Sequence, residues 1–230
     1  MSRGRKLLIA GAAVVVLAVG AFAAVYLIFF TGDSPPPLKL ADQPKEAPSS
    51  TFAGTWVPTS DGEAGYRVRE QLAILPAESD AVGRTSSVTG SFTIADDGEK
   101  IVASDVSIKV DVSTLKSDED RRDNRIRTSG LETDRFPTAT FVASGPIKVP
   151  ATARDGSKVK VTAKGEMTIH GVTKTVEIPI DARAAGDTIE LVGSYEFPMA
   201  DFGMEPPNVV GIVTVHDRAT LEFRLVFTKG

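Results

Sequence analysis

Chemically reactive side chains are scarce in this 230-residue chain, which has two histidines and no cysteine. The absence of cysteine excludes thiolate nucleophiles, disulfides and Cys-type zinc sites. His216 lies beside Asp217 and Arg218, but no second histidine or glutamate stands at metal-ligand spacing to it, so we predict no metal site. His170 precedes Gly171 in a turn sequence, where a ring nitrogen could bond nearby backbone. This favours a structural role for His170 over ligand binding.

Serine is frequent, but the chain has no Gly-x-Ser-x-Gly motif and no serine, histidine and acid in a known catalytic order. Hydrolase chemistry is therefore not supported, and we expect a protein that is not an enzyme and uses no cofactor. One segment gathers arginines that could meet a phosphate head group: Arg121, Arg122, Arg125, Arg127 and Arg135. Acidic residues interleave with them, which favours a solvated helix with local ion pairs.

An uncharged apolar run covers Leu7–Phe30. Its 24 residues would span about 36 Å as a helix, against a hydrocarbon core of roughly 30 Å. Residues 1–6 form a basic tail, which predicts a cytoplasmic N-terminus, a transmembrane anchor over 7–30 and an extracytoplasmic C-terminal domain in the cell membrane. The alternative is a signal peptide cleaved after Ala23, because Ala21-Phe22-Ala23 has the small-x-small pattern of a cleavage site.

Residues 31–51 are rich in Pro, Ser and charged residues, which is typical of an extended linker, and residues 52–230 then suffice for one domain. Beyond the apolar run the chain has 23 basic and 30 acidic residues, a formal charge of −7. This charge disfavours nucleic acid as a partner.

The domain sequence consists of short runs of alternating apolar and polar residues, the pattern of antiparallel strands with one buried face. Eight strands are predicted, the first in two pieces: Thr55–Pro58 with Tyr66–Ile74, Ser86–Ala95, Ile101–Val112, Thr138–Ser144, Lys158–Thr168, Lys174–Ala184, Thr188–Phe197 and Val215–Thr228. Glycine-containing turns between several of these runs favour hairpins. This pattern predicts an all-β fold, and periodicity alone leaves a sandwich and a barrel open.

The alternation assigns side chains to faces within single strands. Val102 shares its parity with Val106, Ile108, Val110 and Val112, which predicts that all five are buried. In the last strand, Leu221, Phe223, Leu225 and Phe227 are predicted to face inward, and Glu222, Arg224 and Thr228 to face water. The exception to the strand pattern is Ser117–Arg127, where Ser117 and Asp120 resemble a helix-capping pair and predict a short exposed helix.

Three motifs, in order along the chain, resemble the YceI-like family. The first lies in Asp118–Ser144 and includes the run Phe136-Pro137-Thr138-Ala139-Thr140-Phe141. The second, Gly165–Lys174, is similar to the family's Leu-Thr-Ile-His-Gly-Val-Thr-Lys hairpin, with Met in place of the first Leu, and the third is Asp201–Met204. Pro58–Gly62 departs from the family's Asp-Pro-x-His-Ser opening.

The resemblance implies an eight-stranded antiparallel lipocalin-like barrel with a short helix, which binds a polyisoprenoid, either an isoprenoid quinone or a polyprenyl phosphate, in an internal cavity. In such a barrel the inward-facing apolar side chains would line the cavity. The candidates are Phe92, Val106, Ile108, Val110, Phe141, Met167, Ile169, Ile178, Leu191, Phe223 and Leu225.

Two alternatives remain open at the level of the sequence. An eight-stranded barrel is narrow enough to be filled by its own side chains, which would make the domain a protein-interaction module. An enzyme acting on an isoprenoid would need acid-base groups inside, and the inward positions are almost all apolar. The sequence does not decide between a monomer and a homodimer, and it does not identify the isoprenoid or its donor and acceptor.

Overall fold

The computed structural model describes Gly20 and residues 34–42, 52–72, 78–209 and 213–230. The predicted membrane segment Leu7–Phe30 lies outside the described residues except for Gly20. Within the described part of the chain, no helix is long and apolar enough to span a bilayer. Pro36–Gly230 forms one compact unit, which contains the β-structure.

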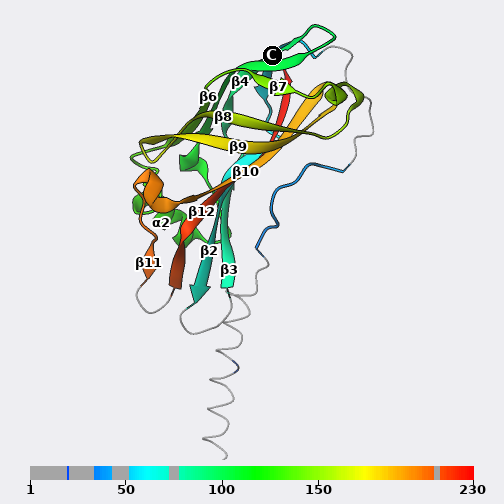
Figure 1. Cartoon of the computed structure of the whole chain (residues 1–230). Helices are drawn as coiled ribbons and strands as arrows, with labels where there is room; N and C mark the ends of the chain where they lie inside the picture. The colour runs from blue at the N-terminus through cyan, green and yellow to red at the C-terminus, as the bar shows by residue number, and fades with distance from the viewer. Residues whose placement is uncertain (1–19, 21–33, 43–51, 73–77, 210–212) are drawn as a thin grey trace, which may run out of the picture. The chain divides into compact units, whose positions relative to one another are not determined.

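The described residues of this unit form an antiparallel sheet that closes on itself (Figure 1). Its strands are β1 (Gly54–Pro58), β2 (Glu63–Leu72), β3 (Glu78–Thr85), β4 (Val88–Asp96), β5 (Ile101–Asp111), β6 (Thr138–Ala143), β7 (Ile147–Val149), β8 (Val159–Ile169), β9 (Val172–Ala185), β10 (Thr188–Pro198), β11 (Asn208–Val209) and β12 (Val213–Lys229). The ring order is β1-β4-β5-β6-β8-β9-β10-β12, and β12 pairs again with β1. The predicted eight-stranded antiparallel barrel is thus confirmed.

Four strands of the described chain lie outside the ring, and three of them, β3, β7 and β11, were not predicted. β2 pairs with β12 and β3 pairs with β2, so the two extend the sheet beyond the point where β12 meets β1. The short strands β7 and β11 pair with β5 and β12. The predicted first strand corresponds to β1 and β2, although Ile74 at its end lies outside the described residues.

A bulge in β5 changes which of its residues face inward. Along β4 the partner shifts from Ser107 opposite Ser91 to Ser104 opposite Thr93, so β5 contains one extra residue there. Asp105 takes a positive φ of 53° at this point. Ile101 and Ala103 therefore face the interior together with Val106, Ile108 and Val110. The prediction that Val102 shares the buried face of Val106 is wrong, because the bulge reverses the alternation between them; Val102 is half-buried opposite Lys148 of β7.

The described helices are short: the α-helix α2 (Asp120–Thr128) and the 3-10 helices η1 (Val112–Thr114), η2 (Ala151–Asp155) and η3 (Met199–Phe202). The predicted helix over Ser117–Arg127 starts three residues later than expected. Ser117 bonds Asp123 instead of capping with Asp120: its backbone N–H and its Oγ lie 2.9 and 2.7 Å from Asp123 Oδ1. The N-cap residue is Glu119, whose side chain makes no capping bond.

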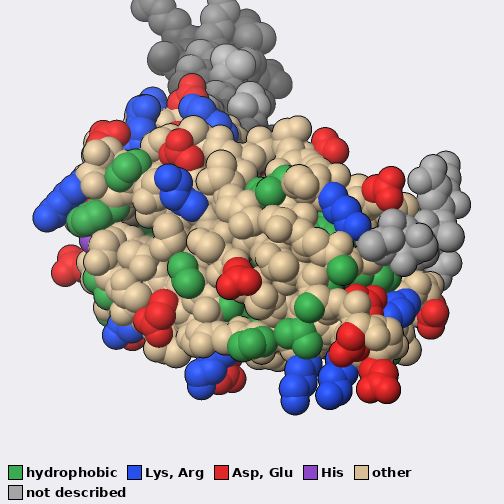
Figure 2. Space-filling model, turned by 90° about the horizontal axis from the view of Figure 1, so that it is seen from above, with side chains coloured by type: hydrophobic (Ala, Val, Ile, Leu, Met, Phe, Trp, Pro, Cys, Tyr) green, Lys and Arg blue, Asp and Glu red, His purple; other side chains and the backbone are tan. Residues whose placement is uncertain are grey.

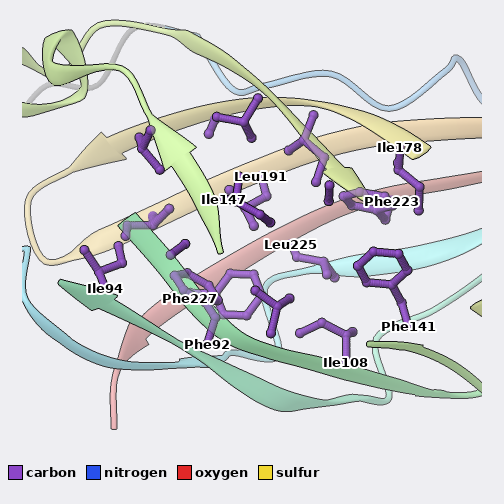
Figure 3. Close-up of a pocket in the computed structure, with 18 of the residues that line it drawn as sticks. Phe92, Ile94, Ile108, Phe141, Ile147, Ile178, Leu191, Phe223, Leu225 and Phe227 are labelled. Atoms are coloured by element: carbon purple, nitrogen blue, oxygen red, sulfur yellow. The ribbon is translucent and has the colours of Figure 1, made fainter. Parts of the chain in front are cut away.

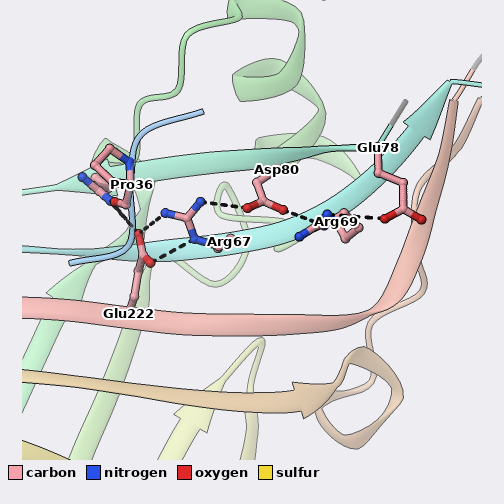
Figure 4. Close-up of polar contacts among 7 residues, drawn as sticks. Pro36, Arg67, Arg69, Glu78, Asp80 and Glu222 are labelled. Atoms are coloured by element: carbon pink, nitrogen blue, oxygen red, sulfur yellow. Dashed lines mark hydrogen bonds and ion pairs between the residues drawn. The ribbon is translucent and has the colours of Figure 1, made fainter. Parts of the chain in front are cut away.

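The outer face of the barrel carries lysine, arginine, aspartate and glutamate side chains of both signs, intermingled with scattered apolar ones (Figure 2). Glu222 of β12 lies on this face, as its parity predicts, yet it is only 3% exposed. Two guanidinium groups cover it: Arg67 Nε lies 3.2 Å from Glu222 Oε2 (Figure 4), and Arg84 Nη2 lies 2.8 Å from Oε1. The expectation that Glu222 faces water is therefore wrong, because long side chains of β2 and β3 fold over it.

Part of the predicted linker lies against the same outer face. Arg84 Nη2 also donates to the carbonyl oxygen of Pro36 at 2.7 Å. Farther along, the Ala41 backbone N–H donates to Glu190 of β10 at 3.1 Å, and Arg183 of β9 donates to the Ala41 carbonyl. Residues 36–42, named here the strap, are thus tied to the barrel at both ends.

We predict that Glu222→Gln destabilises the protein by about 3 kcal/mol, the low end for breaking a buried ion pair, because Arg67 and Arg84 lose the buried carboxylate that they share while they keep Asp80 and Glu63. Thermal unfolding measures the effect, expected as a drop of roughly 6–12 °C for a chain of this size. Glu177→Gln is the matched control, since Glu177 and its partner Lys164 are each more than 60% exposed, and its effect should stay within about 0.5 kcal/mol. Equal, small effects of both substitutions would show that the burial of Glu222 has no energetic consequence.

A second ion pair holds η2 to the end of β4. Arg154 Nη2 and Nε lie 2.5 and 3.2 Å from the two carboxylate oxygens of Asp96. The Arg154 hydrogen bond, with a further one from the Gly98 backbone N–H, lowers the pKa of Asp96 below its ordinary value. A carboxyl group with a lowered pKa in the folded state stabilises the fold fully above its unfolded pKa, and this contribution disappears as the pH falls through the lowered value.

We therefore predict that Arg154→Gln lowers the melting temperature slightly at neutral pH, by less than about 4 °C, because the pair lies at the surface. The difference from wild type should shrink once the pH falls below the ordinary aspartate pKa. Melting temperatures across a pH series check this, with Lys148→Gln, an exposed residue of β7, as the control for loss of one positive charge. A deficit that grows on acidification would contradict the assignment.

Candidate ligand cavity

The barrel interior holds a cavity of about 170 Å³ that is lined by Phe52 and by residues of nine strands and of η2 (Figure 3). Ten of the eleven predicted residues lie in this lining: Phe92, Val106, Ile108, Val110, Phe141, Met167, Ile178, Leu191, Phe223 and Leu225. Parity along each strand places them there, with the β5 bulge keeping both ends of that strand inward. Their position is as predicted, and their contact with a lipid stays a prediction.

Ile169 is the predicted residue that lies elsewhere. It is the last residue of β8, next to the turn into β9, and it is buried in a second cluster with Phe197 and Phe202. The alternation of β8 does point Ile169 inward, but at this level the interior is filled by η3 and its neighbours. Inward parity alone therefore did not separate a cavity wall from a packed core.

Small side chains explain why the cavity stays open. Seven alanines contribute to the lining, and the sequence reasoning named none of them: Ala64, Ala103, Ala139, Ala153, Ala163, Ala182 and Ala184. An eight-stranded barrel is just wide enough to be filled by larger side chains, so alanine at inward positions leaves space unfilled. Two of these alanines, Ala182 and Ala184, could have been predicted from the sequence, because they share the parity of Ile178 and Ile180 on β9.

The side chains that line the cavity are hydrocarbon, apart from the thioether of Met167 and the two polar residues Thr140 and Arg183. Thr140 lies between the inward residues Ala139 and Phe141. Arg183 has its guanidinium on the outer face, where it donates to the Ala41 carbonyl of the strap. A ligand inside this cavity would therefore be held by apolar contact, and its polar groups would have to lie elsewhere.

The other half of the barrel interior holds a second cluster of buried side chains and is named here the packed half. Met167, Phe197 and Phe202 belong to its buried cluster, and the rings of Phe197 and Phe202 meet edge to face with centroids 4.9 Å apart. The interior thus has two parts: the cavity half, with Phe92, Ile94 and Phe227, and the packed half around Phe202. Figure 3 shows Phe92 and Phe227 on one side of the lining, and Phe141 and Phe223 on the other.

His170 connects three segments at the packed half. Its Nδ1 lies 3.1 Å from the Phe202 carbonyl oxygen and its Nε2 lies 3.0 Å from Glu132 Oε2. A carbonyl can only accept, so Nδ1 carries a hydrogen and donates it. His170 and Gly171 both have positive φ, 53° and 73°, as a tight two-residue hairpin between β8 and β9 requires. Both ring nitrogens therefore have protein partners, which agrees with the structural role expected for this histidine.

The arginine-rich segment is engaged in local contacts. Arg122 pairs with Glu70 of β2 at 2.9 Å and with Asp118, and it is only 21% exposed. Arg135 lies over the ring of Phe136, 4.8 Å from its centroid. Arg122 and Arg135 thus have local partners, whereas Arg121, Arg125 and Arg127 are exposed, as expected for a solvated helix.

Tyr66 of β2 is a titratable group whose pKa is changed by burial. Its hydroxyl is buried without a hydrogen-bond partner among the described residues. Burial raises the pKa of Tyr66 well above its ordinary value, and nearby Arg122 opposes that shift. The ring occupies space over Gly83 of β3, where a Cβ would come within 2.4 Å of it. Tyr66 is thus a neutral packing residue on the β2–β3 extension.

Known proteins provide an independent test of this architecture. UPF0312 proteins of Vibrio vulnificus and Shewanella baltica are 30% and 31% identical to this chain over 129 and 133 residues. These alignments cover 53% and 54% of this chain and 64% of each relative, so the chain spans slightly less than two thirds of their length.

Two solved structures share the fold. BcnA of Burkholderia cenocepacia superimposes with a TM-score of 0.54 at 20% identity, covering 74% of this chain and 98% of BcnA. A polyisoprenoid binding domain from Saccharophagus degradans gives a TM-score of 0.56 at 15% identity, covering 77% of this chain and 99% of that domain. The model of the YceI-like domain matches residues 59–227, which include the cavity strands, the His170 turn and η3. The chain therefore belongs to the YceI-like domain family.

Proposed function

We propose that this protein holds a polyisoprenoid, an isoprenoid quinone or a polyprenyl phosphate, in its barrel cavity and thereby sequesters or carries it. The observation that supports this function most directly is a cavity with an apolar lining inside the barrel. The fold is also that of a structure described as a polyisoprenoid binding domain. An open cavity favours lipid binding over the alternative of an interaction module with a filled barrel.

The energetics suit retention without catalysis. Each methylene group transferred from water to an apolar site is worth about 0.8 kcal/mol, so several buried isoprene carbons offset the cost of association. Among the described residues, the lining includes no acid-base pair that could act on the lipid. The polar head group would stay at the cavity mouth, where a membrane or a second protein could receive the lipid.

The first test concerns occupancy of the cavity. Ile108→Trp adds an indole to the wall of the cavity, and Lys109→Trp places the same group on the exposed side of the same strand. We expect wild type and Lys109→Trp to carry isoprenoid after purification, and Ile108→Trp to carry less than about a fifth as much. Mass spectrometry of an organic extract gives lipid per mole of protein. Melting temperatures check the fold, because overpacking costs roughly 1–3 kcal/mol.

If wild-type protein carries no isoprenoid and takes up none when quinone or polyprenyl phosphate is offered, the lipid function is refuted. Equal lipid loading of Ile108→Trp and Lys109→Trp would instead place the lipid outside the cavity.

We further propose that Leu7–Phe30 anchors the protein in the cytoplasmic membrane, with the barrel outside the cytoplasm. Its uncharged length and the basic residues before it support this topology. Full-length protein should stay in the membrane pellet after high-salt and carbonate washing, as assayed by immunoblot. Release into the wash as a form that begins near Ala24 would show a cleaved signal peptide instead.

A further inference from the structure

The cavity ends on a floor of side chains that also pack against the packed half of the barrel. The floor residues line the cavity and belong to or contact the packed cluster: Ala139, Phe141, Met167, Ile178, Ile180, Leu221 and Phe223. Met167 is only 2% exposed and Ile178 only 4%, so the floor is backed by tightly packed structure. Two of its members, Phe141 and Phe223, are large flat rings that lie on the same side of the view in Figure 3.

Each of these rings lies against a glycine of the neighbouring strand. Phe223 of β12 stands opposite Gly193 of β10, and a Cβ on Gly193 would lie 2.5 Å from Phe223 Cζ. In the same way a Cβ on Gly165 of β8 would lie 2.7 Å from Phe141 Cζ. Neither glycine has a positive φ, so these positions need space and not an unusual backbone. The two glycines let the rings lie back against the wall, and this position sets the depth of the cavity.

The volume of the cavity limits the length of isoprenoid tail that it can hold. A cavity of roughly 150 Å³ lined by Leu, Ile and Phe holds one benzene molecule, with about as many carbons as one isoprene unit. The cavity of about 170 Å³ therefore accommodates only a short stretch of an isoprenoid tail while the floor rings stay in place. A longer tail must displace a ring or remain outside.

We propose that Phe141 and Phe223, seated on Gly165 and Gly193, are the residues that determine how much of an isoprenoid tail the protein encloses. This inference rests on the proposed function and adds to it the residues that set the length of tail enclosed. Removing either ring extends the cavity toward the packed half, and each further buried methylene group raises affinity about fourfold. The optimum tail length then moves to longer chains.

The experiment uses full-length protein in lipid nanodiscs, offered geraniol, farnesol, geranylgeraniol and solanesol in separate titrations. Wild-type affinity should rise with tail length and then level off. In Phe141→Ala and Phe223→Ala the rise should continue to longer tails, so that the ratio of geranylgeraniol to geraniol affinity increases at least about tenfold. Glycine variants are unsuitable, because a Cβ at Gly165 or Gly193 would also come within 3 Å of backbone oxygens of Val142 or Pro179.

Phe197→Ala is the matched control. Phe197 belongs to the packed half, is 4% exposed and does not line the cavity. The control substitution therefore removes the same side chain as Phe141→Ala but leaves the floor residues unchanged. Its length profile should match that of wild type. Phe141→Leu and Phe223→Leu replace any alanine variant that does not fold, as judged by thermal unfolding, and should shift the profile in the same direction by a smaller factor.

Wild-type binding with the same length profile in all floor variants overturns this inference and leaves the proposed function standing. A shift in Phe197→Ala equal to that of the floor variants overturns it as well, because the effect would then be general loosening of the core. A wild-type protein that takes up quinone or polyprenyl phosphate but none of the four alcohols overturns the inference as well, because retention would then depend on the head group. A wild-type protein that binds none of these lipids refutes the proposed function itself.

Discussion

The whole architecture depends on a short backbone seam between the first and last strands. Trp56, Val57 and Pro58 of β1 pair with Lys229, Thr228 and Phe227 of β12, and these pairs close the ring. Closure removes the unpaired edges of those strands and creates an inside. Phe227 lies at the seam and is fully buried against Phe92, with ring centroids 4.8 Å apart, so the closing pairs and the apolar interior stabilise each other.

Inside this ring, side-chain size divides the interior into two halves. Alanines on β5, β8 and β9 leave the cavity half open, whereas aromatic and methionine side chains fill the packed half. The segment before Phe136, the β8–β9 turn and η3 meet at the packed half, where His170 contacts both Glu132 and Phe202. The three motifs that resemble the YceI-like family therefore hold one end of the barrel together. The proposed ligand site lies in the other half, where most of its lining comes from strands outside these motifs, although Phe141 and Met167 of the first two motifs also line it.

The outer face has a structural role of its own. Glu222 is buried among arginines, one of which also holds Pro36, so the start of the strap and the charge beneath it are bound to the same guanidinium. The second attachment, at Ala41, uses Glu190 and Arg183 of β10 and β9. The strap thus crosses from the β2–β3 extension to strands whose inner faces line the cavity. Part of the segment predicted to be a simple linker is therefore a component of the barrel surface.

The sequence by itself determined the all-β class, the number of strands in the ring, the hairpin at His170 and the inward face of β12, because strand alternation and turn chemistry are local properties. It also placed ten of eleven residues in the wall of the cavity, since parity fixes which face of a strand is buried. Tertiary structure alone decided the rest. Whether inward residues such as Ile169 meet empty space or packed atoms depends on η3, which lies more than 25 residues along the chain. The burial of Glu222 depends on arginines from two other strands. The reversal of the inward and outward alternation at Val102 depends on a bulge that is set by pairing with β4. The capacity of the cavity depends on the rings of Phe141 and Phe223, which pack against glycines of neighbouring strands. No local sequence pattern brings these residues together.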